Sequence, residues 1–151
     1  MPISTVETSA QVNAAADTIY KVIADYRSHH PAFLPKNYFR KIEVEEGGVG
    51  EGTLFHAEME VYGNKSSFRM RVSEPQPGRV IQETDLESGL ETTFTVEPIS
   101  ADHSIVTIAT RWERPAGSKG WLESKLRGMI MRRIYTEELA LLEQYVATVK
   151  P

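Results

Sequence analysis

Three side chains in this sequence combine a titratable group with a position beside apolar residues. Glu138 is the one charged residue on the apolar face of the C-terminal helical pattern, whose other members are Ile134, Tyr135, Leu139, Leu141, Leu142, Tyr145, Val146 and Val149. A carboxyl group in apolar surroundings has a raised pKa and can act as a general acid or base. Tyr26 and His30 border a segment with two prolines and are the other candidates for proton transfer. Alternatively, Glu138 reaches water beyond the sheet edge, and His30 belongs to an exposed loop.

Composition and spacing exclude several kinds of site. The chain has no cysteine, which excludes disulfides, thiolate catalysis and cysteine-bound metals. Its four histidines, at positions 29, 30, 56 and 103, lack the close spacing of a metal site. The chain also lacks a Ser-His-Asp arrangement, a phosphate-binding glycine loop and a dinucleotide-binding motif. We therefore expect neither a metal nor a cofactor.

Charge and hydrophobicity limit the possible partners. The chain has 151 residues, of which 17 are Lys or Arg and 21 are Asp or Glu, and its net charge is −4. Because nucleic-acid-binding proteins present basic surfaces, nucleic acid is not an expected partner. No run approaches the roughly 20 apolar residues of a membrane span, and the first residues do not resemble a signal peptide. We expect a single domain over residues 1–151, in a cytoplasmic monomer or small homo-oligomer.

The N-terminal part is predicted to hold one strand and two short helices. Ile3–Val12 alternates between apolar and polar residues, which predicts a strand. Ala14–Tyr26 has apolar residues at three- and four-residue spacing, which predicts a helix that packs on one side. Pro31 and Pro35 limit the next segment, residues 27–36, to one short helical turn.

The middle of the chain has the two-residue period of strands. Six more strands are predicted, at Tyr38–Glu45, Gly52–Tyr62, Lys65–Glu74, Arg79–Leu86, Leu90–Glu97 and Ser104–Glu113. The segments between them are short and rich in Gly, Pro, Asn, Asp and Ser, which are turn residues. Short connections favour an antiparallel meander.

The hairpin registers determine which side chains face inward. A turn at residues 63–64 would pair Met59 with Phe68. Two positions further, Ala57 would meet Met70, so this pair of strands has an apolar inner face.

A polar group is also predicted on the inner face. A three-residue loop at residues 87–89 would turn Gln82 and Thr84 inward, beside Thr92 and Thr110. Because buried polar groups need hydrogen-bond partners, a ligand or ordered water is expected there. Alternatively, these are ordinary strand residues that are satisfied locally.

The orientation of the last strand depends on the loop before it. A five-residue loop at residues 99–103 places Val106, Ile108, Thr110 and Trp112 on the inner face. A loop shorter by one residue would turn Arg111 inward and Trp112 outward. The number of apolar residues favours Trp112 inside.

The long helical pattern over residues 118–149 is predicted to cover the sheet. Leu122, Leu126 and Met129 point away from its later apolar face, and Gly128 lies where the direction changes. The order of elements predicts an α+β helix-grip fold. In this fold a seven-stranded curved antiparallel sheet wraps around a long C-terminal helix, with two short helices between strands 1 and 2, and a cavity remains between sheet and helix.

Three stretches carry a resemblance to known proteins: VNAAADTIYKVIADY at residues 12–26, VGEGTLF at residues 49–55 and VSEPQPGRVI at residues 72–81. They resemble the START-like (SRPBCC) superfamily, and within it the polyketide cyclase/dehydrase-type proteins. The resemblance covers almost the whole chain and implies the helix-grip fold. That superfamily includes lipid and hormone carriers, aromatase/cyclases and coenzyme Q-binding proteins, so an apolar small-molecule ligand is implied.

Inward-facing residues are the candidate ligand contacts: Leu34, Phe55, Met59, Phe68, Met70, Gln82, Thr84, Thr92, Phe94, Ile108, Thr110, Trp112, Ile130, Ile134 and Tyr135. The leading hypothesis is that they bind a hydrophobic or aromatic molecule, lipid- or polyketide-like. An alternative is a polyketide cyclase/dehydrase-like enzyme that transfers protons through Glu138, His30 or Tyr26. A third hypothesis is a protein-interaction module with a filled core, whose working surface is the outward stripe of Glu58, Glu60, Arg69 and Arg71.

Overall fold

The computed structural model describes residues 2–149 and confirms the predicted α+β helix-grip fold. Its elements are β1 (Ile3–Val12), α1 (Ala16–Ala24), the 3-10 helix η1 (His30–Phe33), β2 (Phe39–Glu46), β3 (Leu54–Val61), β4 (Asn64–Gln76), β5 (Val80–Asp85), β6 (Glu91–Ser100), β7 (His103–Glu113) and α2 (Gly117–Val146). The strands form one antiparallel sheet in the order β1-β7-β6-β5-β4-β3-β2. Within this part of the chain, no helix combines the length and the apolar character needed to cross a bilayer.

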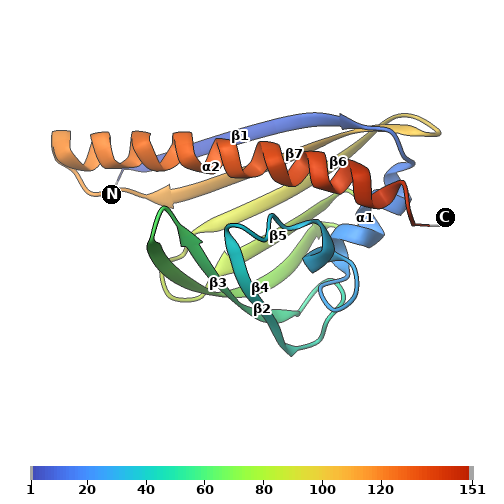
Figure 1. The fold of residues 1–151 in the computed structure, drawn as a ribbon, viewed down its shortest axis with the longest axis horizontal. Coiled ribbons are helices and arrows are strands. Elements are labelled where there is room, and N and C mark those ends of the chain that lie inside the picture. Colours follow the sequence, from blue (N-terminus) through green and yellow to red (C-terminus); the bar gives the residue numbers. More distant parts are fainter. Residues whose placement is uncertain (1, 150–151) are drawn as a thin grey trace.

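The long helix α2 covers one end of the sheet more closely than the other. It packs against β1, η1 and α1. Figure 1 shows α2 running along β1 and β7, while β2, β3 and β4 lie at the other end of the sheet, away from this helix. Leu139, Leu142 and Val146 fix this arrangement, since each is at most 3% exposed. Burying each such side chain contributes roughly 1.5–3 kcal/mol. The second half of α2 therefore anchors the helix.

The predicted register between β6 and β7 is confirmed. Thr92 pairs with Thr110 and Phe94 with Ile108. The turn itself is tighter than the predicted five-residue loop, because Ser100 pairs with His103 after a register shift. Trp112 is 5% exposed and lies inside, which settles the orientation of the last strand.

The predicted register between β3 and β4 is wrong by two residues. The turn consists of Tyr62 and Gly63, whose φ angles are 49° and 80°, and Val61 pairs with Asn64. Positive φ at both central residues matches a type I′ turn, whose twist fits the flanking strands. Met59 therefore faces Ser66 rather than Phe68. A shift of two keeps every side chain on its predicted face.

The predicted register between β5 and β6 is wrong by one residue, which reverses the faces of β5. The loop has four residues, because the N–H of Asp85 still donates to the carbonyl of Leu90 at 2.8 Å. The Asp85 carboxylate holds this loop by accepting bonds from the backbone N–H and the hydroxyl of Ser88, at 3.0 and 2.6 Å. Gln82 and Thr84 consequently lie on the outer face, and the buried residues of β5 are Ile81, Glu83 and Asp85.

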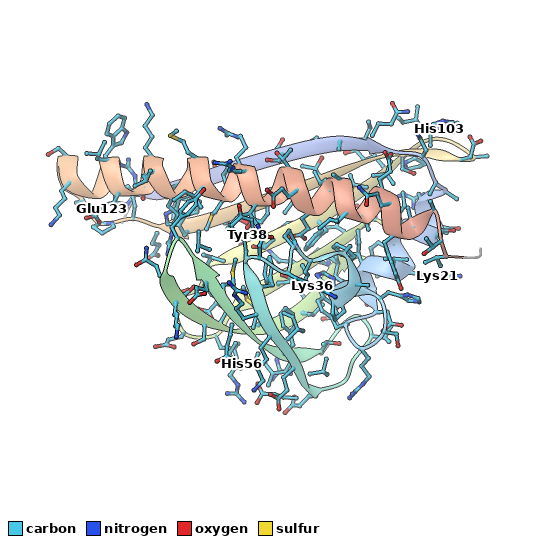
Figure 2. All side chains as sticks on the ribbon, in the orientation of Figure 1. Lys21, Lys36, Tyr38, His56, His103 and Glu123 are labelled. Carbon is cyan, nitrogen blue, oxygen red and sulfur yellow. The ribbon has the colours of Figure 1, made fainter. Side chains whose placement is uncertain are left out.

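The outer face of the sheet carries the charged stripe of the protein-interaction hypothesis. Arg69 pairs with Glu45 at 3.1 Å and Arg71 with Glu46 at 2.9 Å. These two arginines are thus matched by acidic residues of the edge strand β2. Figure 2 shows His56 on the same outer side, away from α2.

Candidate functional site

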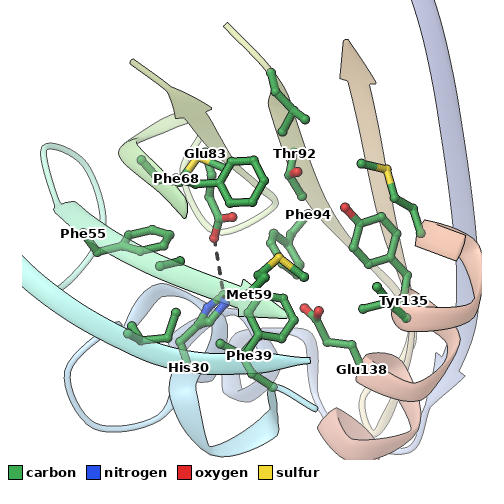
Figure 3. Close-up of a pocket in the computed structure, with 17 residues that line it drawn as sticks. His30, Phe39, Phe55, Met59, Phe68, Glu83, Thr92, Phe94, Tyr135 and Glu138 are labelled. Atoms are coloured by element: carbon green, nitrogen blue, oxygen red, sulfur yellow. Dashed lines mark ion pairs between the residues drawn. The ribbon is translucent and has the colours of Figure 1, made fainter. Parts of the chain in front are cut away.

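A pocket of about 90 Å³ lies between α2 and the inner face of the sheet. Figure 3 shows its lining. The lining residues belong to η1 and the residue after it, to β2–β6 and the residue before β6, and to the middle of α2. The lining residues are His30, Leu34, Phe39, Ile42, Phe55, Ala57, Met59, Phe68, Met70, Glu83, Leu90, Thr92, Phe94, Met131, Ile134, Tyr135 and Glu138. The wall is mainly aromatic rings, thioethers and aliphatic side chains, which suit an apolar ligand.

The pocket meets the surface where α2 is not packed on the sheet. Phe39, Ile42, Met59, Phe68 and Met131 are half-buried, whereas most of the other lining residues are buried. These five residues come from β2, β3, β4 and α2, so they mark the rim between the helix and the far strands. Thioether side chains adapt to different shapes, and two of the five rim residues are methionines.

Glu138 points into this pocket from α2 (Figure 3). It is 2% exposed, and no residue between 2 and 149 forms a hydrogen bond or ion pair with its carboxyl group. Burial, together with the nearby charge of Glu83, raises the pKa of Glu138 well above its usual range. This shift favours the uncharged acid, which can donate one hydrogen bond into the pocket. The sequence-based alternative, in which Glu138 reaches water, is wrong.

A second carboxyl group, that of Glu83, enters the pocket from β5. It is 7% exposed, and its Oε2 accepts a hydrogen bond of 2.7 Å from the Tyr26 hydroxyl. Burial raises the pKa of Glu83 to about 7, although the bond from Tyr26 acts in the opposite direction. The same burial and the charge of Glu83 raise the pKa of Tyr26 well above its usual value. Tyr26 thus remains a hydrogen-bond donor, and Glu83 is the group that exchanges a proton near pH 7.

His30 completes this cluster as a neutral imidazole. It is 3% exposed, and its Nδ1 donates to the carbonyl oxygen of Ile23 at 2.7 Å. Burial lowers the pKa of His30 to about 4. Its Nε2 lies 3.8 Å from Glu83 Oε2, the contact dashed in Figure 3. Because the histidine loses its proton near pH 4 and the glutamate near pH 7, the two groups are not both charged at any pH, and the contact is not an ion pair.

The hydroxyls of Thr92 and Tyr135, which line the pocket, are joined by the Thr110 hydroxyl behind it. Thr110 Oγ1 lies 2.8 Å from Thr92 Oγ1 and 2.6 Å from the Tyr135 hydroxyl. Burial raises the pKa of Tyr135 to about 12. These hydroxyls satisfy one another, so the predicted need for a ligand beside Thr92 and Thr110 does not arise. Glu138 is different, since its carboxyl has no such partner among the described residues.

A glycine-rich loop holds Tyr26 and His30 in place. The N–H of Tyr26 donates to the carbonyl of Gly48 at 2.8 Å, and the N–H of Gly50 donates to the carbonyl of Ala24 at 2.9 Å. Gly50 has φ +67°, and a Cβ there would lie 2.6 Å from the Glu74 carboxylate. Glycine is favoured at this φ, and the backbone bonds of this loop position the end of α1.

The structure gathers most of the predicted site residues around one pocket. Glu138 and His30 line it, and Tyr26 contacts it through Glu83. The predicted ligand contacts that line it are Leu34, Phe55, Met59, Phe68, Met70, Thr92, Phe94, Ile134 and Tyr135. His30 is buried, so its sequence-based placement in an exposed loop is wrong.

Six predicted contact residues lie elsewhere. Ile108, Thr110 and Trp112 are buried behind or beyond the pocket, and the Trp112 Nε1 donates to the Ser124 hydroxyl at 3.2 Å. Ile130 is half-buried and lies outside the lining. Gln82 and Thr84 face outward, as the register of β5 requires, and the Gln82 amide donates to the Glu91 carboxylate at 3.1 Å.

The chain belongs to the family described as polyketide cyclase/dehydrase and lipid transport, whose sequence profile matches residues 4–147. A search of curated proteins found no match. Among solved structures, the chain is similar to the KanY protein, with 26% identity, a TM-score of 0.84 and coverage of 97% of this chain and 99% of that one.

Two further solved structures share the fold at lower identity. One is the Zhui aromatase/cyclase of Streptomyces sp. R1128, with 18% identity, a TM-score of 0.78 and coverage of 97% and 94%. The other is norcoclaurine synthase from Thalictrum flavum in complex with dopamine and hydroxybenzaldehyde, with 20% identity, a TM-score of 0.72 and coverage of 99% and 90%. At these identities the likeness concerns the fold alone.

Proposed function

We propose that this protein binds an apolar or aromatic small molecule that carries an oxygen atom, in the pocket between α2 and the sheet. The observation that carries the proposal is the carboxyl group of Glu138, which is buried, aimed into an apolar pocket and without a protein partner in the described chain. Burying a polar group without a hydrogen bond is unfavourable. A carbonyl, phenol or ether oxygen of a ligand would accept the bond that the neutral carboxyl offers. The family's description, which includes lipid transport, agrees with an apolar ligand.

The size of the pocket implies that its rim moves when a ligand enters. Ligand pockets typically measure about 300–1,000 Å³, and an engineered cavity of about 150 Å³ binds benzene. The present pocket of about 90 Å³ is smaller than both. The half-buried rim residues Phe39, Met59 and Met131 can change rotamer at little cost, since they are packed on one side only.

A pair of ligands that differ in one atom tests the role of Glu138. We expect 2-acetylnaphthalene to bind about fivefold more tightly than 2-isopropenylnaphthalene, which has CH₂ in place of the carbonyl oxygen, because one hydrogen bond contributes about 1 kcal/mol. Glu138→Leu should abolish this preference while it leaves the binding of the hydrocarbon within about threefold. Fluorescence titration at about pH 6 measures both. If Glu138→Leu still prefers the ketone over the hydrocarbon, the ligand's oxygen does not bind to Glu138.

A second candidate function is proton transfer to and from a carbonyl compound, and Glu83 is the observation that favours it. A general base works best when its pKa lies near the operating pH, and the pKa of Glu83 is about 7. In this reaction the Glu83 carboxylate would remove a proton from the carbon beside a ketone, and the neutral Glu138 carboxyl would donate a hydrogen bond to the enolate oxygen. Return of the proton to the carbon restores both groups. Zhui, an aromatase/cyclase, shares the fold.

Deuterium exchange separates this candidate from binding alone. In D₂O the protein should accelerate exchange of the methyl protons of 2-acetylnaphthalene, followed by NMR. Glu83→Gln should reduce the acceleration at least about 100-fold, the scale of general acid–base catalysis, without weakening binding more than about threefold. If the unmodified protein binds the ketone but exchange proceeds at the rate in buffer, the protein is a binder and not a catalyst for this reaction.

A further inference from the structure

The first half of α2 presents an apolar strip to solvent. Leu122, Leu126 and Met129 are 63%, 58% and 60% exposed, and Trp121 beside them is 50% exposed. At 3.6 residues per turn the first three fall within about 60° of the helix circumference. The buried residues Gly120 and Ser124 are on the other side of the helix. The change of apolar direction seen in the sequence thus leaves four large side chains without a covering element.

Basic residues flank this strip on both sides. At the helical spacing of 100° per residue, Lys119 lies along one edge of the strip and Lys125 and Arg132 along the other, and Arg133 follows the strip one turn after Met129. All four are exposed. Residues 117–133 contain five basic residues and one acidic residue, Glu123, whereas the whole chain has a net charge of −4. The first half of α2 is therefore a basic amphipathic surface on an acidic protein.

These cations also lack a carboxylate partner within the part of the chain that the structure describes, and the one polar contact of Arg133 is a hydrogen bond of 3.4 Å to the Tyr62 hydroxyl. On the sheet, four arginines have carboxylate partners, namely Arg40, Arg69, Arg71 and Arg111. No ion pair forms at Lys119, Lys125, Arg132 or Arg133 among residues 2–149. Instead the Lys125 ammonium lies 5.0 Å from the centre of the Trp121 ring. The strip combines uncovered apolar surface with uncompensated positive charge.

We propose that the first half of α2 docks on the surface of an anionic lipid bilayer. A helix with an apolar stripe, a Trp beside it and Lys or Arg on both flanks lies in the interface, with its apolar side chains among the acyl chains and its cations at the headgroups. A second copy of this chain is a poorer occupant, because the same surface would bring two positively charged helices together. Docking leaves the pocket free, since the pocket is lined from α2 only by Met131 and residues after it.

Vesicle flotation with the full chain tests this inference. The protein should bind vesicles of phosphatidylcholine with about 30 mol% phosphatidylserine and not vesicles of phosphatidylcholine alone, and added salt should release it. Lys125→Gln with Arg132→Gln should weaken binding about 25-fold, since each cation near an anionic surface contributes about fivefold. Leu126→Gln with Met129→Gln should weaken it at least about tenfold. All four positions are exposed, so the variants should fold.

Matched controls decide between docking, net charge and self-association. Lys36→Gln with Lys65→Gln makes the same charge change at exposed positions away from α2 and should change binding less than about twofold. Emission of Trp121 should shift to the blue on anionic vesicles and not in Trp121→Phe, because Trp112 is already buried. No binding by the unmodified protein, or equal loss in both charge variants, overturns the proposal. A dimer in sedimentation equilibrium that Leu126→Gln with Met129→Gln dissociates would assign the strip to a second copy instead.

Discussion

Replacing Glu83 by glutamine is expected to remove about 3 kcal/mol of pH dependence from the free energy of unfolding. Burial raises the pKa of Glu83 from 4.5 to about 7, and each pKa unit corresponds to about 1.4 kcal/mol. Since the folded-state pKa is the higher one, the contribution is fully present below pH 4.5 and is lost as the pH rises to 7. Glutamine does not ionise and still accepts the bond from Tyr26, so Glu83→Gln should be the more stable protein at about pH 8.

Two neighbouring groups also have pKa values shifted by burial, and their contributions must be separated from that of Glu83. Glu138 acts in the same direction, because burial raises its pKa as well. His30 acts in the opposite direction: burial lowers its pKa from 6.5 to about 4, so its contribution is present above pH 6.5 and is lost as the pH falls to 4. Both groups remain in Glu83→Gln, so the difference between variant and unmodified protein isolates Glu83 to first order.

Urea unfolding at several pH values between about 5 and 8 measures this difference. The control is Glu97→Gln, an exposed glutamate on β6, which should change the free energy of unfolding by less than about 0.5 kcal/mol at every pH. If the free energy of unfolding depends on pH in the same way for Glu83→Gln and the unmodified protein, the Glu83 carboxyl is in contact with water and its pKa is not raised. The pocket would then lack its proton-exchanging group near neutral pH.

The fold was predictable because its apolar pattern is strong and its connections are short. The alternation in β1 and β7 and the anchoring residues Leu139 and Leu142 each specify one face, and those faces are buried as expected. The error in the predicted β3–β4 register left the inner and outer faces of both strands as predicted, since a shift of two residues keeps each side chain on its face. Burial pattern thus determined the layers even where the turn was misplaced.

Glu83 was missed for a physical reason. Counting a three-residue loop placed Gln82 inside, but the Asp85 carboxylate closes a four-residue loop through Ser88. Side-chain capping of this kind adds one residue to a turn without changing the hydrophobic pattern of the strands. The one available signal was Asp85 itself, followed three residues later by Ser88. The contact of Glu83 with Tyr26 joins positions 57 residues apart, which periodicity does not reveal.

The strip on α2 was visible in the sequence only as a change of direction. The helical spacing of 100° per residue shows that Leu122, Leu126 and Met129 point away from the later apolar face. It does not show whether another element of the fold covers them. The structure shows them exposed, because β1 and β7 cover only the opposite side of the helix. Exposure depends on what the fold places nearby, and a helical pattern alone carries no such information.

Ala57→Leu should abolish ligand binding in the pocket without unfolding the protein. Ala57 is 4% exposed and lines the pocket from β3. Leucine adds three carbon atoms on the β3 wall of the pocket and so occupies space that the ligand needs in a pocket of about 90 Å³. Affinity for 2-acetylnaphthalene should fall at least about 100-fold. Stability should stay within about 1 kcal/mol, because the new side chain fills existing space.

The matched control makes the same substitution on the other face of the sheet. Ala109 on β7 is half-buried and points outward between Glu7 and Thr93. Ala109→Leu should leave affinity for 2-acetylnaphthalene within about twofold, because the outer face is separated from the pocket by the sheet itself. Titration calorimetry with both variants, together with thermal unfolding, measures the contrast. If Ala57→Leu folds and still binds the ketone with unchanged affinity, the ligand site lies outside this pocket, and Glu138 and Glu83 lose their proposed role together.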